Sequence, residues 1–282
     1  MPVNEKHSRA LFAKLIRQLK KLGAKPALDS VHKFRTASRR AEALLSDLVP
    51  KPGRNDKKLV KMLQRLRRKA GRERDLEVQS TLLRNLKIPE LTRQKSQLLA
   101  ALGEERIRRQ EKLESACDKE TRRELRKRLK RAADNISISE GEPLKAALRL
   151  LGELPSDHAP LTENLLHQYR ITGKRARYLA ELAGKDPQAQ RVVEQLKRMQ
   201  DAIGNWHDWW KLTQRGEQMF GGVQGSPLVA ALGNITRAKF RQAVDALAQT
   251  RVELVLRKPV AISSAGRKAP DRQPQKTAAA VA

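Results

Sequence analysis

Cysteine, aromatic residues and long apolar runs are all scarce in this sequence of 282 residues. The single cysteine, Cys117, excludes an internal disulfide, a thiolate metal cage and a redox pair of thiols, and it fits a reducing compartment. Aromatic residues make up only 3% of the chain, so few surfaces are left for stacking bases, and modules that bind single-stranded RNA or DNA are disfavoured. Because no apolar run reaches the length of about 18 residues that a membrane span needs, and the N-terminus is charged, we expect a cytoplasmic protein without membrane association.

Patterns that form strands are missing as well, and helical patterns take their place. Apolar residues recur at spacings of three and four, as at Leu11, Leu15 and Leu19, and they reach 39% of the chain, which is enough for a core. The predicted fold class is all-α. The expected helices cover residues 6–22, 28–48, 56–70, 74–86, 90–132, 142–152, 160–183, 187–203, 207–219 and 227–256.

The charge is strongly one-sided. Lys and Arg number 60 against 31 acidic residues, so the formal net charge is +29, an excess that is destabilising unless a polyanion offsets it. Residues 257–282 lack an apolar period and are rich in Ala, Pro and Ser, which predicts a disordered tail, so the excess belongs to the folded body over 6–256. The dense basic run over 122–131 is interpreted as the solvated face of a long helix and not as a site.

Motifs that would indicate catalysis are absent. The chain contains neither the glycine-rich phosphate loop G-x-x-x-x-G-K nor an H-E-x-x-H helix, and no catalytic triad is visible. We therefore expect a protein that acts by recognition, with no catalytic residue, no bound metal and no cofactor.

An internal repeat is the most informative feature of the sequence. Residues 31–41 align without a gap on residues 166–176. Both segments contain an apolar residue, a histidine, any residue, an aromatic residue and an arginine, followed later by two adjacent basic residues and an alanine. A second pair follows, because residues 59–76 correspond to residues 192–209. The body is therefore predicted to be a duplicated helical unit.

On a helical wheel the repeated segments separate charge from apolar residues. His32, Arg35 and Arg39 fall within one arc, and Arg40 lies on its flank. The second copy places its own basic residues in the same way. The apolar stripe behind the first arc is formed by Phe34, Ala37, Ala41, Leu45 and Leu48, and the second by Tyr169, Thr172, Ala176, Ala180 and Ala183.

Each copy is followed by a Gly-x-x-x-Asp element, Gly71 to Asp75 and Gly204 to Asp208. We interpret each as a glycine that ends one helix and an aspartate that caps the next, and a metal-binding or catalytic role for the two aspartates is the less favoured reading. Other residues outside the repeat also receive structural interpretations. Trp206, Trp209 and Trp210 are expected to pack in the core, and His7 and His158 to be surface residues.

These motif blocks, in this order over about residues 6–256, resemble the CHAD domain. The resemblance implies two four-helix bundles, about 6–132 and 142–256, that are related by a pseudo-twofold axis and enclose a basic cavity that binds inorganic polyphosphate. The E-x-E-x-K signature of the CYTH domain, with which CHAD domains are often joined, is missing, so a stand-alone type is indicated. The basic ligands implied by position are His32, Arg35, Arg39 and Arg40 in the first half and His167, Arg170, Lys174 and Arg175 in the second.

The residue types suit a phosphate chain. Each Arg offers two parallel hydrogen bonds to one phosphate and stays charged, and Arg35 and Arg39 are about 6 Å apart along a helix axis, so that successive phosphates can be held in series. A bound anion would favour the charged form of His32 and His167, which are expected to respond to pH. Because Lys174 stands where the first copy has Arg39, the halves are expected to contribute unequally.

Two other function classes stay open at this point. The charge alone also fits an RNA- or DNA-binding protein, and weak nucleic-acid binding is expected in either case. A metal-dependent polyphosphate or triphosphate hydrolase, with His32 or His167 as acid or nucleophile, is the enzyme alternative. By resemblance, the protein would be found in the cytoplasm and at polyphosphate granules.

Overall fold

The computed structural model describes residues 5–22, 28–87, 93–136, 143–154, 162–222 and 226–255. Within these ranges the chain forms nine α-helices and no strand, which confirms the all-α prediction. Within the same ranges, no helix is both long enough and apolar enough to cross a bilayer. The helices are α1 (Glu5–Lys21), α2 (Leu28–Ala43), α3 (Arg54–Asn85), α4 (Gln94–Ala116), α5 (Lys119–Asp134), α6 (Pro143–Gly152), α7 (Glu163–Leu182), α8 (Pro187–Phe220) and α9 (Pro227–Val255), and a π-helical turn η1 (Leu44–Leu48) follows α2.

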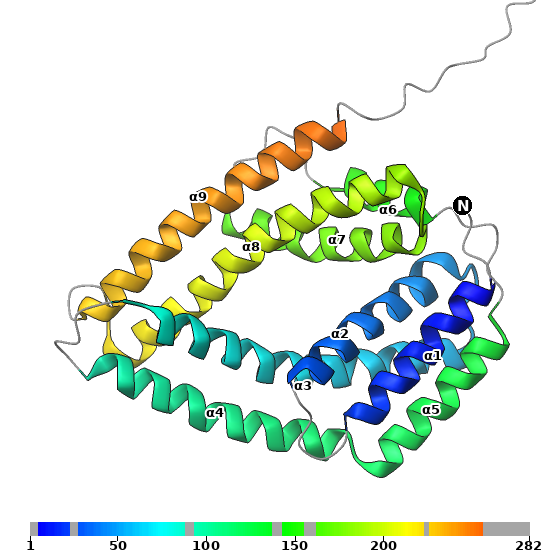
Figure 1. The fold of residues 1–282 in the computed structure, drawn as a ribbon, viewed down its shortest axis with the longest axis horizontal. Coiled ribbons are helices and arrows are strands. Elements are labelled where there is room, and N and C mark those ends of the chain that lie inside the picture. The colour runs from blue at the N-terminus through cyan, green and yellow to red at the C-terminus, as the bar shows by residue number, and fades with distance from the viewer. Residues whose placement is uncertain are drawn as a thin grey trace, which may run out of the picture.

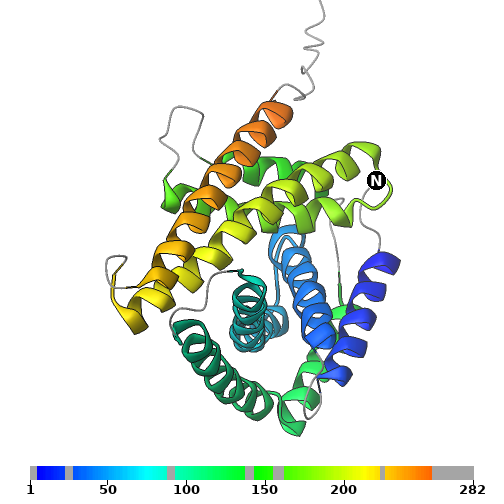
Figure 2. The same ribbon diagram turned by 60° about the vertical axis from the view of Figure 1, so that its left-hand side comes forward.

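The helices pack mainly against their neighbours in the sequence. In the first half α1 packs on α2, α2 on α3 and α3 on α4, and in the second half α6 packs on α7, α7 on α8 and α8 on α9. Helix α5 returns to pack on α1 and α3. Figure 1 shows that the α3/α4 and α8/α9 hairpins extend toward the same side, and Figures 1 and 2 both show α7 and α8 facing α2 and α3. The two halves meet where α2 contacts α7 and α3 contacts α8.

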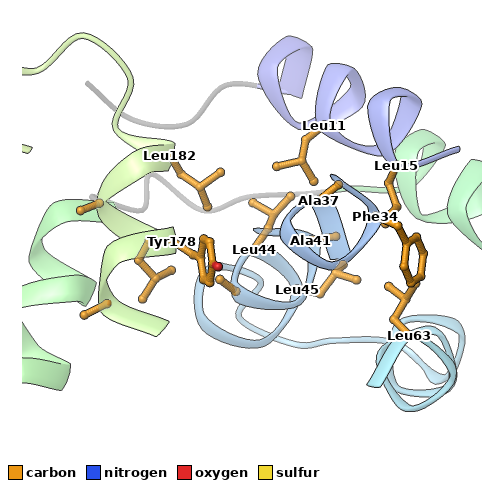
Figure 3. Packing of buried hydrophobic residues seen from close by; sticks show 14 of the residues in the cluster. Leu11, Leu15, Phe34, Ala37, Ala41, Leu44, Leu45, Leu63, Tyr178 and Leu182 are labelled. Atoms are coloured by element: carbon orange, nitrogen blue, oxygen red, sulfur yellow. The ribbon is translucent and has the colours of Figure 1, made fainter. Parts of the chain in front are cut away.

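The main hydrophobic core is continuous through both halves. Phe34 of α2 is fully buried beside Leu15 and Leu63, and Tyr178 of α7 lies against Leu44 in the same cluster (Figure 3). The apolar stripes predicted for the repeated segments are buried, except that Thr172 is only half-buried. The helical wheel therefore identified the correct buried faces.

A second, smaller core joins the far parts of the two hairpins. It combines apolar side chains of α3, α4, α8 and α9, one pair from each helix. The ion pair between Arg215 of α8 and Glu105 of α4, at 2.5 Å, links the same hairpins. The buried members of this core are Leu76, Leu83, Leu98, Leu102, Trp209, Leu212, Leu228 and Leu232.

The helix breaks predicted at Gly71 and Gly204 are wrong. Both glycines lie inside continuous helices, because 56–70 and 74–86 are joined in α3, and 187–203 and 207–219 in α8. Asp75 and Asp208 are therefore not helix caps. A glycine inside a helix costs only about 1 kcal/mol relative to alanine, which packing along the whole length of a helix easily offsets.

Two other boundaries also differ from the prediction. The long helix expected over 90–132 is two helices, because the Asp118 side chain accepts a hydrogen bond from the Thr121 backbone at 2.6 Å and caps a new helix, α5. The helix expected over 28–48 changes to a π-helical turn at Leu44. The first half therefore contains five α-helices within its described residues, α1 to α5.

Trp206 and Trp209 are buried in the two cores, as predicted, whereas Trp210 is only partly buried. His7 is exposed. His158 and the tail over 257–282 lie outside the described residues.

Replacing Phe34 by Ala tests the position of the main core. The change removes a fully buried ring and should lower the free energy of unfolding by about 3–5 kcal/mol, measured from urea unfolding curves. Ile107→Ala is the control, since Ile107 of α4 is 61% exposed and its truncation should change stability by less than about 0.5 kcal/mol. Equal losses from the two variants would contradict this description of the core.

Candidate functional site

Four of the predicted basic residues converge where the two halves meet. Arg35 and Arg39 come from α2, and Arg170 and Lys174 come from α7, the helix that α2 contacts. Lys174 lies within electrostatic range of the other three, and Arg39 lies within range of both Arg35 and Arg170. We call these four residues the basic cluster.

A cavity of about 380 Å³ opens beside the basic cluster, between α2, α3 and α7. It is lined by basic residues from both halves, by two acidic residues and by a few neutral side chains. The lining is Arg39, Glu42, Ala43, Ser46, Asp47, Gln64, Arg67, Arg170, Ile171, Lys174, Arg175 and Tyr178.

The acidic residues of the cavity are occupied by other partners. Glu42 pairs with Arg67, and Asp47 pairs with Arg175. By contrast, Arg39, Arg170 and Lys174 form no ion pair with any carboxylate among the described residues. The Nε atom of Arg170 is buried and donates no hydrogen bond within the same residues. The cavity therefore holds positive charge that no direct ion pair neutralises, which is the property of an anion-binding site.

The electrostatic cost of this arrangement is clearest at Lys174. Burial lowers the pKa of Lys174 to about 7, and the like charges of Arg170 and Arg39 act in the same direction, against a smaller opposing effect of Asp208. Burial also lowers the pKa of Arg39, although the Tyr178 hydroxyl partly offsets this. A bound anion would raise the pKa of both Lys174 and Arg39 again, since a nearby negative charge favours the protonated form of each group.

The aspartates of the two Gly-x-x-x-Asp elements act on the basic cluster, and neither element ends a helix. Arg35 Nη1 lies 3.9 Å from Asp75 Oδ1, and the guanidinium lies beside Gly71, where a Cβ atom would be 3.4 Å from Arg35 Nη2, an ordinary van der Waals contact. In the second half, Asp208 acts on the charge of Lys174. The two aspartates therefore partly compensate the basic cluster from α3 and α8.

The two histidines of the repeat border the basic cluster and are exposed. The pKa of His32 is lowered below its ordinary value, mainly by partial burial of the ring and to a smaller extent by the positive charge of Arg74. Burial, followed by the charge of Arg170, lowers the pKa of His167 in the same way. Both imidazoles are therefore largely neutral at pH 7 in the ligand-free protein.

Arg40 and Arg175 hold the two halves together. Arg40 Nε donates to Glu181 Oε2 of α7 at 2.7 Å, and Arg175 Nε donates to Asp47 Oδ2 of η1 at 2.9 Å. The hydrogen bond that Arg175 donates to the Asp47 carboxylate raises the pKa of Arg175. These arginines occupy equivalent positions in the repeat and make reciprocal ion pairs across the halves. Their predicted contact with phosphate stays a prediction.

Three residues near the site were not predicted. Arg67 of α3 lines the cavity, Arg74 faces His32, and His207 of α8 faces His167. Arg74 and His207 are equivalent in the repeat, where each stands one residue before the aspartate of its element. That shared position is the signal that could have identified them, whereas nothing in the sequence distinguishes Arg67 from the other basic residues of α3.

A family model described as CHAD domain matches residues 7–217. The match covers most of the chain, includes both repeated segments and both Gly-x-x-x-Asp elements, and confirms the resemblance seen in the sequence. No curated protein matches the chain.

Replacing Lys174 by Met tests how much the buried charge of Lys174 destabilises the folded protein. Because the pKa of Lys174 is lowered in the folded state and ordinary in the unfolded state, folding disfavours its charge. The neutral side chain should therefore raise the Tm of the ligand-free protein by at least about 3 °C in a thermal melt at neutral pH.

The gain from Met should be larger at pH 6, where Lys174 is fully charged, than at pH 9, where the folded protein has lost that proton. Lys197→Met, at an exposed position of α8, is the matched control and should leave the Tm unchanged. A lower Tm for Lys174→Met than for the control would show that the charge of Lys174 does not destabilise the folded protein.

Proposed function

The chain belongs to the CHAD domain family, and from this premise we propose that it binds inorganic polyphosphate in a basic cavity to which both halves contribute. One observation carries the proposal. Arg39 of α2 and Arg170 and Lys174 of α7 line one cavity, and none of them forms an ion pair with a carboxylate of the described residues. Burying these like charges together destabilises the folded protein, and a ligand that neutralises them explains why they are found there.

The shape of the site suits a linear polymer of phosphates. Arg35 and Arg39 follow one another along α2 at about 6 Å, and Arg170 and Lys174 do the same along α7. Guanidinium groups bind phosphate oxygens through paired hydrogen bonds, and neither a base nor a sugar is needed for this contact. A chain that passes between α2 and α7 would meet cations from both helices.

The proposal includes a duplicated architecture with a pseudo-twofold axis. Equivalent helices meet at the centre, α2 with α7 and α3 with α8. Equivalent arginines also make reciprocal ion pairs, Arg40 with Glu181 and Arg175 with Asp47. The register differs by one residue, because Glu181 corresponds to Ser46 in the repeat, and the π-helical turn over 44–48 lies at this point.

We also propose that the protein recognises polyphosphate and does not cleave it. The residues gathered at the cavity are suited to binding, since arginines stay charged and do not exchange protons at physiological pH. A location in the cytoplasm and at polyphosphate granules belongs to the same proposal. Incubation with long-chain polyphosphate and Mg²⁺ or Mn²⁺ tests this part, and release of phosphate would contradict it.

Removal of the basic cluster tests the binding site directly. In the variant with Arg35→Ala, Arg39→Ala, Arg170→Ala and Lys174→Ala, the affinity for polyphosphate should fall by about 100-fold or more, because four cations that neutralise phosphates are removed. The salt dependence of binding should fall as well. Fluorescence anisotropy with labelled polyphosphate measures the affinity, and circular dichroism should show unchanged helix content.

A matched variant distinguishes the effect of losing the site from the effect of losing net charge. Arg123, Arg126, Lys127 and Lys130 are exposed on α5, and replacing them by Ala removes the same total charge. This variant should bind polyphosphate within about threefold of the unchanged protein. Equal losses in both variants, or displacement of polyphosphate by duplex RNA at equal phosphate concentration, would favour nonspecific polyanion binding instead.

The affinity should also depend on pH. The free Lys174 amine has a pKa of about 7 and must be protonated to neutralise phosphate, so the affinity for long polyphosphate should rise about tenfold from pH 8 to pH 6. The charges around this amine are Arg35 and Arg39 of α2, Arg170 of α7 and Asp208 of α8.

Lys174→Arg provides the check, because arginine keeps its charge throughout this range. The variant should show a flatter pH profile at constant ionic strength and keep only the contribution of His32 and His167. An unchanged profile would contradict the role given to Lys174.

A further inference from the structure

Four rings form a continuous series of contacts at the second-half side of the basic cluster. His167 of α7 stacks on His207 of α8 with ring centroids 6.3 Å apart, His207 contacts Trp210 at 5.8 Å, and Trp210 stacks on Trp206 at 5.9 Å. We call these four rings the aromatic ladder. It holds all the stacked ring pairs of the described residues, in a chain with only 3% aromatic residues.

The ladder runs from the main core to the surface beside the basic cluster. Trp206 is 2% exposed and anchors it in the main core, whereas His167, at the other end, is exposed. Arg170, Lys174 and Lys211 all lie within electrostatic range of His167. The exposed ring of the ladder therefore borders the cations that the proposed function assigns to phosphate.

The first half has no equivalent of the ladder. The positions that correspond to Trp206, His207 and Trp210 are Glu73, Arg74 and Glu77 in α3. Glu73 and Glu77 pair with Arg106 of α4, so an ion-pair network occupies the place of the indoles. Whatever the ladder does, it does only in the second half.

Packing explains the buried rings of the ladder but not the exposed one. Trp206 and Trp210 fill space against Phe240 and the main core. His167 lies at the surface and adds little buried area, yet its ring is held nearly parallel to that of His207, at 23°. An exposed flat ring that is held at a fixed angle is suited to stacking on another flat ring.

We propose that the His167 end of the aromatic ladder binds the base of a nucleotide whose phosphates enter the basic cluster. The ligand class is a nucleoside triphosphate or a longer nucleoside polyphosphate. The base stacks on His167, which His207 and Trp210 support from behind, and the phosphates contact Arg170 and Lys174. This inference rests on the proposed function, because it assigns the phosphates to the same cations.

A comparison of ATP with inorganic tripolyphosphate tests the inference. Both ligands compete against labelled polyphosphate on the full chain, without metal ions. Tripolyphosphate carries at least as much negative charge, so electrostatics alone predicts that it binds more tightly than ATP. Stacking of the base predicts the opposite order, with ATP at least about fivefold tighter.

Variants of His167 and His32 show which of the two rings gives ATP its advantage over tripolyphosphate. His167→Ala should reduce ATP to the affinity of tripolyphosphate, and His167→Phe should keep the advantage of ATP because the ring is restored. His32→Ala, at the equivalent position without the ladder, should weaken both ligands equally and leave the advantage of ATP intact.

The inference is overturned if tripolyphosphate competes as well as ATP, if neither competes while polyphosphate binds, or if His167→Ala keeps the advantage of ATP. In these cases the proposed polyphosphate site still stands, provided that the variant without the basic cluster fails to bind polyphosphate. If that variant binds polyphosphate normally, the proposed function itself has failed.

Discussion

The burial of like charges at the junction of α2 and α7 is the constraint on which the rest of the structure depends. Arg35, Arg39, Arg170 and Lys174 converge there from two segments that lie far apart in the sequence. Their burial and, as a smaller effect, their mutual repulsion oppose folding, and both lower the pKa of Lys174. The surrounding packing must therefore keep the two helices together without help from the cluster itself.

That packing comes from both sides of the junction. The main core passes from α1 and α2 into α7, where Tyr178 lies against Leu44 (Figure 3), and the second core joins the hairpins α3/α4 and α8/α9. Two ion pairs, Arg40 with Glu181 and Arg175 with Asp47, tie the halves beside the cavity. The basic cluster is thus held in place by packing on both sides of the junction.

The sequence predicted the parts of this account that depend on periodicity and repetition. The helical wheel identified the buried stripe behind Phe34, and the repeat identified the four residues of the basic cluster. Local rules failed where packing along a whole helix decides the outcome, as at Gly71, which lies inside α3 instead of ending a helix. Arg67 and the reciprocal ion pairs of Arg40 and Arg175 could not be predicted, because they depend on how the halves dock.

The central claim is that the halves form one anion site and not two. Isothermal titration of tripolyphosphate into the full chain, repeated with Arg39→Ala and with Lys174→Ala, measures this most directly. A shared site predicts one bound ligand per chain and a weaker affinity at that single site in both variants, since the two residues line the same cavity. Two bound ligands per chain, of which each variant loses only one, would contradict it.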